Sequence, residues 1–435
     1  MKMKPIAFFA ALILGLLPAS FSPAAPRHDI CADLGPSLPV GLSSFSAAGD
    51  WLVEAHDEHG VAWGLVYIYL VPPGEDIDGQ RWFINHKAEV ARSVGAIPVY
   101  TFYQILHIGR NAGLTGSEPE IVRAVMEDGS LMRAYFDNFV IVLQAAAGID
   151  PPVIVHVEPD SWGFMMWAMG VEGNGDATSI FAQVDGSGHP GAAGLPDNAA
   201  GLGRALVHLR DTHAPHVRLG WHASNFRVGT RPEVVTSFFA GMGDWDVLFT
   251  ENPHNEADES SWWEPWDEEL TNTNLAWFDS VTAGAGVPIL LWQLPIGTTD
   301  WHLLADPGDR SMLERFAAAG VAGLLFEHLG EGDPDQFRGE GALGTVPPAE
   351  TGAGGTAADM RGRLAAYSAD PLAWPEGSPC RVGGPADVPD IADIPDSPEI
   401  SDPAEAPGEA GPSDADSELD TALDSAGDLA DSIDD

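Results

Sequence analysis

The chain has 435 residues, enough to bury the core of one large domain or of two modest ones. Its formal net charge is −45, with 20 Lys and Arg against 65 Asp and Glu. Such a surface repels nucleic acid, anionic lipid and polyanionic polysaccharide, so these partners are excluded. Neutral substrates or cations suit this charge better.

The first 25 residues predict an export signal. Two lysines precede an apolar run of roughly a dozen residues, which is too short to span a bilayer, and small residues follow it. We therefore expect cleavage near residues 22–24 and no membrane insertion after it. The mature protein is predicted to be secreted or periplasmic.

The chain contains two cysteines, Cys31 and Cys380, at the two ends of the part that has a globular composition. An even number of cysteines in an exported chain favours a disulfide. Two free thiols are the alternative. A bond between these residues would tie the ends of the domain together.

Residues 383–435 differ from the rest of the chain, because they contain no Lys, Arg or aromatic residue while carboxylates and prolines recur. This segment cannot bury enough apolar area to offset its chain entropy. We therefore predict a disordered acidic tail. One domain is expected to occupy residues 26–382.

Short apolar, β-branched runs alternate with longer helical patterns through this domain. The predicted strands are 38–44, 61–71, 96–104, 151–158, 217–223, 245–251, 287–294 and 321–328. The predicted helices are 83–94, 117–148, 197–213, 231–242, 272–284, 309–319 and 356–368. Eight strands with intervening helices favour a (β/α)8 barrel. A doubly wound sheet is the competitor, but no Gly-rich phosphate turn follows the first strand.

In such a barrel the chemistry lies at the C-terminal ends of the strands. The indole ring of tryptophan suits the C–H face of a sugar, although filling of the core is its alternative role. The candidate substrate-binding residues are Tyr103, Trp162, Trp221, His222, Asn225, Trp292 and Gln293. The candidate catalytic carboxyls are Glu158, Asp160, Glu251, Asp300 and Glu327.

The stretch PPVIVHVEPDSWGF, residues 151–164, carries the chemical hypothesis. A proline between Glu158 and Asp160 ends the strand and fixes the turn that presents Asp160. A neighbouring aromatic such as Trp162 would desolvate this carboxyl and keep it protonated, as a general acid requires. An aspartate that merely caps the start of a loop is the alternative.

Three segments of the chain resemble the family 6 glycoside hydrolases, which invert the anomeric carbon. They are VIVHVEPDSW before and around Asp160, GWHASNF around His222, and LLWQLPIGTTD at residues 290–300. The resemblance implies that Asp160 is the general acid, Asp300 the base and Trp292 a sugar-stacking residue. Two features depart from that family: residues 100–117 contain no acidic side chain, and Leu294 stands where the family has lysine. The family's barrel has seven strands, whereas eight are predicted here.

The sequence as a whole predicts an exported, monomeric glycoside hydrolase that acts on a neutral poly- or oligosaccharide without a cofactor. If the enzyme retains configuration, Glu251 or Glu327 must be the nucleophile, because the seventh strand ends in Gln293 rather than in a glutamate. A catalytically inactive carbohydrate-binding barrel is the first alternative. The second is a metal-dependent hydrolase that uses four histidines at the mouth, His156, His222, His254 and His328.

Overall fold

The computed structural model describes residues 29–43, 50–70, 77–150, 152–169, 173–223, 231–251, 268–295, 310–327 and 357–381. The predicted export signal and the predicted acidic tail lie outside these residues. Within the described ranges, no helix combines the length and the apolar character that a membrane crossing requires.

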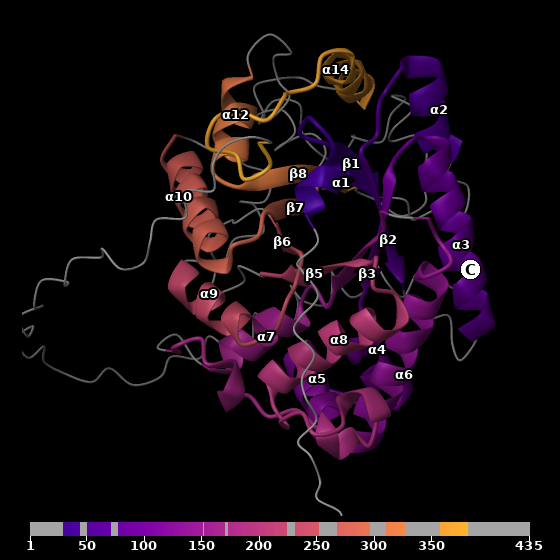
Figure 1. The fold of residues 1–435 in the computed structure, drawn as a ribbon, viewed down its shortest axis with the longest axis vertical. Coiled ribbons are helices and arrows are strands. Elements are labelled where there is room, and N and C mark those ends of the chain that lie inside the picture. Colours follow the sequence, from indigo (N-terminus) through magenta and orange to yellow (C-terminus); the bar gives the residue numbers. More distant parts are fainter. Residues whose placement is uncertain are drawn as a thin grey trace, which may run out of the picture.

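Eight parallel strands close into a barrel in which each strand pairs with its sequence neighbours and β1 pairs with β8 (Figure 1). The predicted (β/α)8 fold is therefore confirmed. The strands are β1 (Val40–Ser43), β2 (Leu65–Leu70), β3 (Ile97–Phe102), β4 (Ile154–Val157), β5 (Arg218–His222), β6 (Val247–Glu251), β7 (Ile289–Pro295) and β8 (Val321–Glu327). Both faces of these strands are apolar because helices cover the outside while side chains fill the interior.

Helices surround the barrel, and most of them follow the strands in turn (Figure 1). The α-helices are α1 (Ile30–Leu34), α2 (Asp50–His59), α3 (Ile77–Ser93), α4 (Ile105–Asn111), α5 (Glu118–Glu127), α6 (Gly129–Ala146), α7 (Ser161–Ala168), α8 (Ala199–His213), α9 (Pro232–Ala240), α10 (Glu268–Ala285), α12 (Ser311–Ala318) and α14 (Ala357–Ala369). Three short 3-10 helices, η1 (Ala177–Ser179), η2 (Asp185–Ser187) and η3 (Pro190–Ala192), lie between α7 and α8.

The single helix predicted over residues 117–148 is wrong, because the structure divides it into α5 and α6. The break lies at Asp128, which has an extended backbone conformation. Its carboxylate accepts hydrogen bonds from the backbone N–H groups of Ser130 and Leu131, at 2.7 and 3.0 Å. Asp128 thus caps a new helix instead of continuing the old one.

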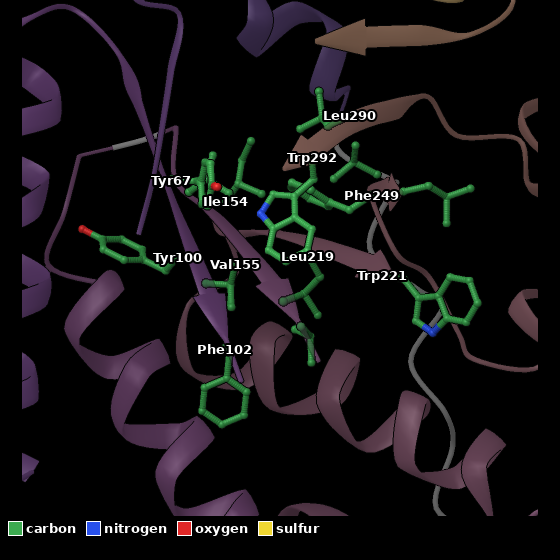
Figure 2. Close-up of a cluster of buried hydrophobic side chains, with 14 of the residues drawn as sticks. Tyr67, Tyr100, Phe102, Ile154, Val155, Leu219, Trp221, Phe249, Leu290 and Trp292 are labelled. Atoms are coloured by element: carbon green, nitrogen blue, oxygen red, sulfur yellow. The ribbon is translucent and has the colours of Figure 1, made fainter. Parts of the chain in front are cut away.

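Side chains alternate between the barrel interior and the helix layer along each strand. On β3, Phe102 points outward and its ring packs 5.0 Å from that of Phe139 on α6. Inside the barrel, the rings of Tyr67 on β2 and Trp292 on β7 meet at 5.9 Å. Figure 2 shows both groups: Phe102 lies beyond the strands, while Tyr67 and Trp292 face each other between them.

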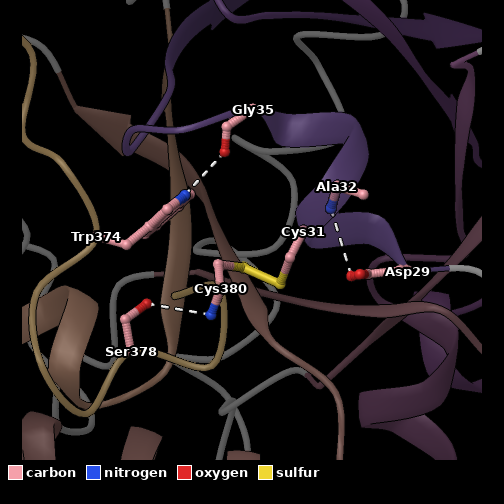
Figure 3. The surroundings of a disulfide bond; sticks show 7 residues. All are labelled: Asp29, Cys31, Ala32, Gly35, Trp374, Ser378 and Cys380. Atoms are coloured by element: carbon pink, nitrogen blue, oxygen red, sulfur yellow. Dashed lines mark hydrogen bonds between the residues drawn. A yellow bond between two sulfur atoms is a disulfide. The ribbon is translucent and has the colours of Figure 1, made fainter. Parts of the chain in front are cut away.

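A disulfide joins Cys31 of α1 to Cys380, as predicted (Figure 3). Two further contacts hold this region. The indole N–H of Trp374 donates to the carbonyl of Gly35 at 2.8 Å, and Arg218 forms an ion pair with Asp33 at 2.6 Å. Because Arg218 begins β5, helix α1 lies at the N-terminal ends of the strands, opposite the end where barrel enzymes carry out their chemistry.

Candidate active site

Asp160 lies where the main chain leaves β4 and enters α7, as the helix's N-cap residue. Its side chain is partly exposed to solvent, but the surrounding protein atoms bury the carboxyl enough to raise its pKa. The hydrogen bond from Tyr103 lowers this pKa, whereas the negative charge of Glu251 raises it. A carboxyl whose protonated form is favoured in this way can donate a proton.

Glu158 is fully buried and serves the fold. Its carboxylate accepts hydrogen bonds from the backbone N–H groups of Gln104 and Ile105, at 2.8 and 3.1 Å, and from the Ser161 hydroxyl at 2.8 Å. Burial raises the pKa of Glu158 to about 7, against the effect of these hydrogen bonds. The carboxylate thus joins the end of β4 to the start of α4, and its burial argues against direct contact with a substrate.

Glu251 is the last residue of β6, and its carboxyl is the second one of the candidate site, after that of Asp160. Its side chain is 29 % exposed, and its Oε2 lies 2.5 Å from Nε2 of His222. His222 is buried beneath it and makes a second hydrogen bond, of 2.8 Å, to His156. Glu251 is also close enough to Asp160 for its negative charge to raise the pKa of Asp160.

A bulge in β7 shapes the opposite wall. Leu291 pairs with Leu324 of β8 and Leu294 pairs with Phe326, so β7 has one more residue than β8 between these two pairs. Within the bulge, Gln293 has a positive φ of 51°. The extra residue lets two consecutive side chains reach Tyr69: the ring of Trp292 lies 5.7 Å from the Tyr69 ring, and the Gln293 amide donates to its hydroxyl at 2.7 Å.

Two of the predicted sugar-stacking residues, Trp162 and Trp221, pack instead outside the barrel. Both side chains are fully buried, and their rings lie 5.9 Å apart. The Trp162 indole donates to the carbonyl of Val157 at 2.9 Å, and Trp221 contacts Phe239 of α9. Figure 2 shows Trp221 turned away from the interior residues. Protein atoms cover both indole faces, so neither residue offers a surface to a sugar.

The remaining predicted tryptophan, Trp292, lies inside the barrel but is also nearly covered, at 3 % exposure. Its ring contacts those of His156 and His222 at 5.1 and 5.3 Å. Trp292 therefore forms the base of the site beneath the carboxyls. Its indole nitrogen is buried without a hydrogen-bond partner among the residues that the structure describes.

Several predicted residues stay untested. Asp300 and Asn225 lie outside the described residues, as does the side chain of Glu327. Two contributors to the site were not predicted, namely Tyr69 and Thr101, whose hydroxyl contacts His156. The alternation of Tyr67 and Tyr69 along one strand was the available signal for Tyr69, since it places both rings on the interior face.

The structure limits the metal-site alternative. His156 and His222, the two described histidines of that hypothesis, bond to each other. His254 and His328 lie outside the described residues. Among the residues with described side chains, one group of three brings its ligand atoms close enough to share a metal: Glu54, Glu58 and His59, at the surface of α2. That group includes none of the predicted mouth residues.

Comparisons with known proteins establish no family for the chain. No protein-family model and no curated protein sequence matches the chain. Among solved structures, a Bacteroidetes-affiliated GH5 cellulase matches with a TM-score of 0.44 at 12% identity over 78% of this chain and 92% of its own. GH26C from Muricauda sp. matches with a TM-score of 0.42 at 14% identity over 69% and 81%. An aldolase from Escherichia coli K12 matches with a TM-score of 0.36 at 10% identity over 79% and 94%.

The predicted resemblance to the family 6 glycoside hydrolases is wrong. No family model supports it, and the glycoside hydrolases named among the structural matches belong to families 5, 10 and 26. The barrel also closes with eight strands instead of seven. The matching positions were a few residues at three strand ends, where any barrel carries polar groups and turns.

Proposed function

We propose that the chain hydrolyses a glycosidic bond of a neutral carbohydrate, with Asp160 as the general acid and Glu251 as the second carboxylate. The observation that carries the proposal is the placement of both groups at the C-terminal end of the barrel: Asp160 follows β4 as the N-cap of α7, and Glu251 ends β6, 2.5 Å from Nε2 of His222 and close enough to Asp160 to raise its pKa. Glycoside hydrolysis requires one carboxyl that is protonated beside one that is ionised.

The two carboxyls differ in the way this division of roles requires. Burial raises the pKa of Asp160, which favours its protonated form. Glu251 is more open to solvent than the histidines beneath it and lies at hydrogen-bond distance from His222. A hydrogen bond donated to a carboxylate favours its charged form. Asp160 is then the proton donor, and Glu251 is the base or the nucleophile.

Export of the mature chain belongs to the same proposal. The Cys31–Cys380 disulfide supports it, because such bonds persist in oxidising compartments. A polysaccharide too large to enter a cell would be reached there. The high negative charge of the chain favours a substrate without acidic groups.

The test is release of reducing ends from neutral glucans, xylans and mannans by the full chain and by Asp160→Asn and Glu251→Gln. Loss of one acid–base group is expected to lower the rate by about 10²-fold or more in each variant. Asp137→Asn, an exposed aspartate on α6, is the matched control and should keep full activity. Hydrolysis that survives in Asp160→Asn would refute its role, and the anomer first released distinguishes inversion from retention.

A carbohydrate-binding barrel without catalysis is the second candidate. It is favoured by Gln293, an amide at the end of β7, where retaining barrel glycosidases place a glutamate. The amide is held by the Tyr69 hydroxyl at 2.7 Å. Binding of a glycan from the same panel, with no release of reducing ends by the full chain, would establish this function instead.

A further inference from the structure

Four side chains from four consecutive strands form a continuous hydrogen-bonded chain inside the barrel. The Thr101 hydroxyl on β3 lies 3.3 Å from Nδ1 of His156 on β4. Nε2 of His156 lies 2.8 Å from Nδ1 of His222 on β5, and Nε2 of His222 lies 2.5 Å from Glu251 on β6. The first three residues are buried, so the chain reaches solvent only at Glu251.

The chemistry of these groups fixes the direction of the hydrogen bonds. A carboxylate only accepts, so His222 must donate to Glu251 from Nε2. A neutral His222 then accepts at Nδ1, and His156 must donate to it from Nε2. The remaining nitrogen of a neutral His156, Nδ1, accepts from the Thr101 hydroxyl. For an ionised Glu251 and two neutral histidines, one arrangement of protons therefore satisfies all three contacts, whereas a His222 protonated on both nitrogens would donate from Nδ1 to His156.

The surroundings keep His156 neutral. Its ring is stacked 4.0 Å from that of Phe249 at an interplanar angle of 15°, and the Trp292 ring closes another side at 5.1 Å. Burial lowers the pKa of His156. His156 therefore carries a single proton, which lies on one of its two ring nitrogens.

We propose that Thr101 and His156 are positioning residues that fix His222 as the tautomer with its proton on Nε2, and thereby hold Glu251 as an ionised carboxylate beside Asp160. The catalytic part of this inference rests on the proposed function. The tautomer itself does not, because it follows from the contacts of an ionised Glu251 with two neutral histidines. The described titratable groups next to this chain are Asp160 and, beside Asp160, Tyr103.

The direct test is ¹⁵N NMR of the full chain labelled at histidine, because protonated and bare imidazole nitrogens have well-separated shifts. At pH 7, His222 and His156 are both expected to carry the proton on Nε2, with a bare Nδ1. The variants His156→Asn and His222→Gln assign the signals. A proton on Nδ1 of His222, or a doubly protonated His222, would overturn the proposal.

The matched variants are Thr101→Val and Thr101→Ser. Valine has the shape of threonine without the hydroxyl, so His156 is expected to lose its single tautomer; serine keeps the donor and should restore it. Thermal unfolding of each variant shows whether the barrel is intact. Unchanged ¹⁵N shifts in a folded Thr101→Val protein would also overturn the proposal.

Activity provides a separate readout. In Thr101→Val the acidic limb of the kcat/KM profile should move to higher pH by about half a unit to one unit, because the hydrogen bond to the Glu251 carboxylate is weakened. Thr101→Ser should keep the original limb. If no glycan is hydrolysed but the tautomers are as stated, the proposed function fails and the positioning of Glu251 stands. If hydrolysis occurs and the limb does not move, the positioning role fails alone.

Discussion

The Glu158 carboxylate and the backbone N–H of Gln104 are joined by a 2.8 Å hydrogen bond that ties the end of β4 to the end of β3. Glu158 is buried and has a left-handed φ of 51°, a conformation that is costly for a residue with a side chain. The hydrogen bonds to its carboxylate hold this turn in place. Asp160, two residues later, depends on the turn for its position at the mouth.

Glu158→Gln is expected to change how stability depends on pH. An unfolded chain releases this proton near pH 4.5, whereas the folded chain releases it near pH 7. Between these values the folded state holds a proton that the unfolded state has lost, so stability falls as pH rises. Glutamine has the same shape and no proton to lose, so it should remove this fall, which is on the order of 3 kcal/mol.

Urea unfolding of both proteins between pH 4 and pH 8 measures the effect of Glu158→Gln. Glu127→Gln, an exposed glutamate at the end of α5, is the control and should leave the slope of stability against pH close to that of the parent chain. Equal slopes for the parent chain and Glu158→Gln would show that Glu158 is already ionised in the folded protein.

Tyr103→Phe is expected to raise the pKa of Asp160. The Tyr103 hydroxyl lowers that pKa, so its removal leaves burial and the charge of Glu251 with less opposition. The basic limb of activity, where the acid loses its proton, should therefore move to higher pH. Titration of the Asp160 carboxyl by ¹³C NMR measures the shift without any substrate.

The control for Tyr103→Phe is Tyr100→Phe on the same strand. Tyr100 points outward, and its hydroxyl donates to the carbonyl of Ile84 on α3 at 2.6 Å. Its loss can weaken the packing of α3 but should leave the Asp160 titration where it is. A downward shift of the Asp160 titration in Tyr103→Phe would contradict the assigned contact.

Gly220→Ala is expected to destabilise the barrel by about 1–3 kcal/mol. A methyl group at this position of β5 would overlap the ring of Phe249, which in turn stacks on His156. Moving that ring also disturbs the histidine pair, so the His156 NMR signals should shift. Gly362→Ala on α14, where the added methyl meets no atom within 4 Å, should instead leave the melting temperature unchanged or raise it. If Gly220→Ala left the stability of the protein unchanged, the Phe249 ring would have room to move.

The sequence alone was sufficient to predict the barrel, but it predicted the candidate site less completely. Each strand is an apolar run that is buried on both faces. This pattern can be recognised in the sequence without knowing which strands pair. Helix α7 was missed because SWGFMMWA is apolar on nearly every side, so it has no amphipathic period to detect. Polar residues at the ends of the strands correctly marked where Asp160 and Glu251 lie.

Residue type alone did not tell which side of a strand a tryptophan occupies. Trp221 and His222 are consecutive, and the pairing of β5 with its neighbours decides that the histidine points inward and the indole outward. The bulge at Trp292 and Gln293 contains no glycine or proline from which it could have been predicted. The hydrogen-bonded histidine pair depends on both features and could not be placed from the sequence.

Replacing Cys31 and Cys380 together by serine is expected to cost about 2–5 kcal/mol of stability, because the bond closes a loop with a sequence separation of 349 residues. Thermal unfolding with and without reductant measures this: the parent chain should lose stability on reduction, and the double variant should not respond. If the reductant opens the disulfide and the stability of the parent chain does not fall, the expected stabilisation by this bond is contradicted.

The same disulfide turns the folded part of the chain into a covalent ring. A protease that cuts one peptide bond anywhere between Cys31 and Cys380 opens this ring into a single linear piece instead of releasing a fragment. The two halves of the barrel stay tethered at the N-terminal ends of the strands, beneath the carboxyls. A protein built in this way can lose the continuity of a mouth loop and still keep its eight strands in one molecule.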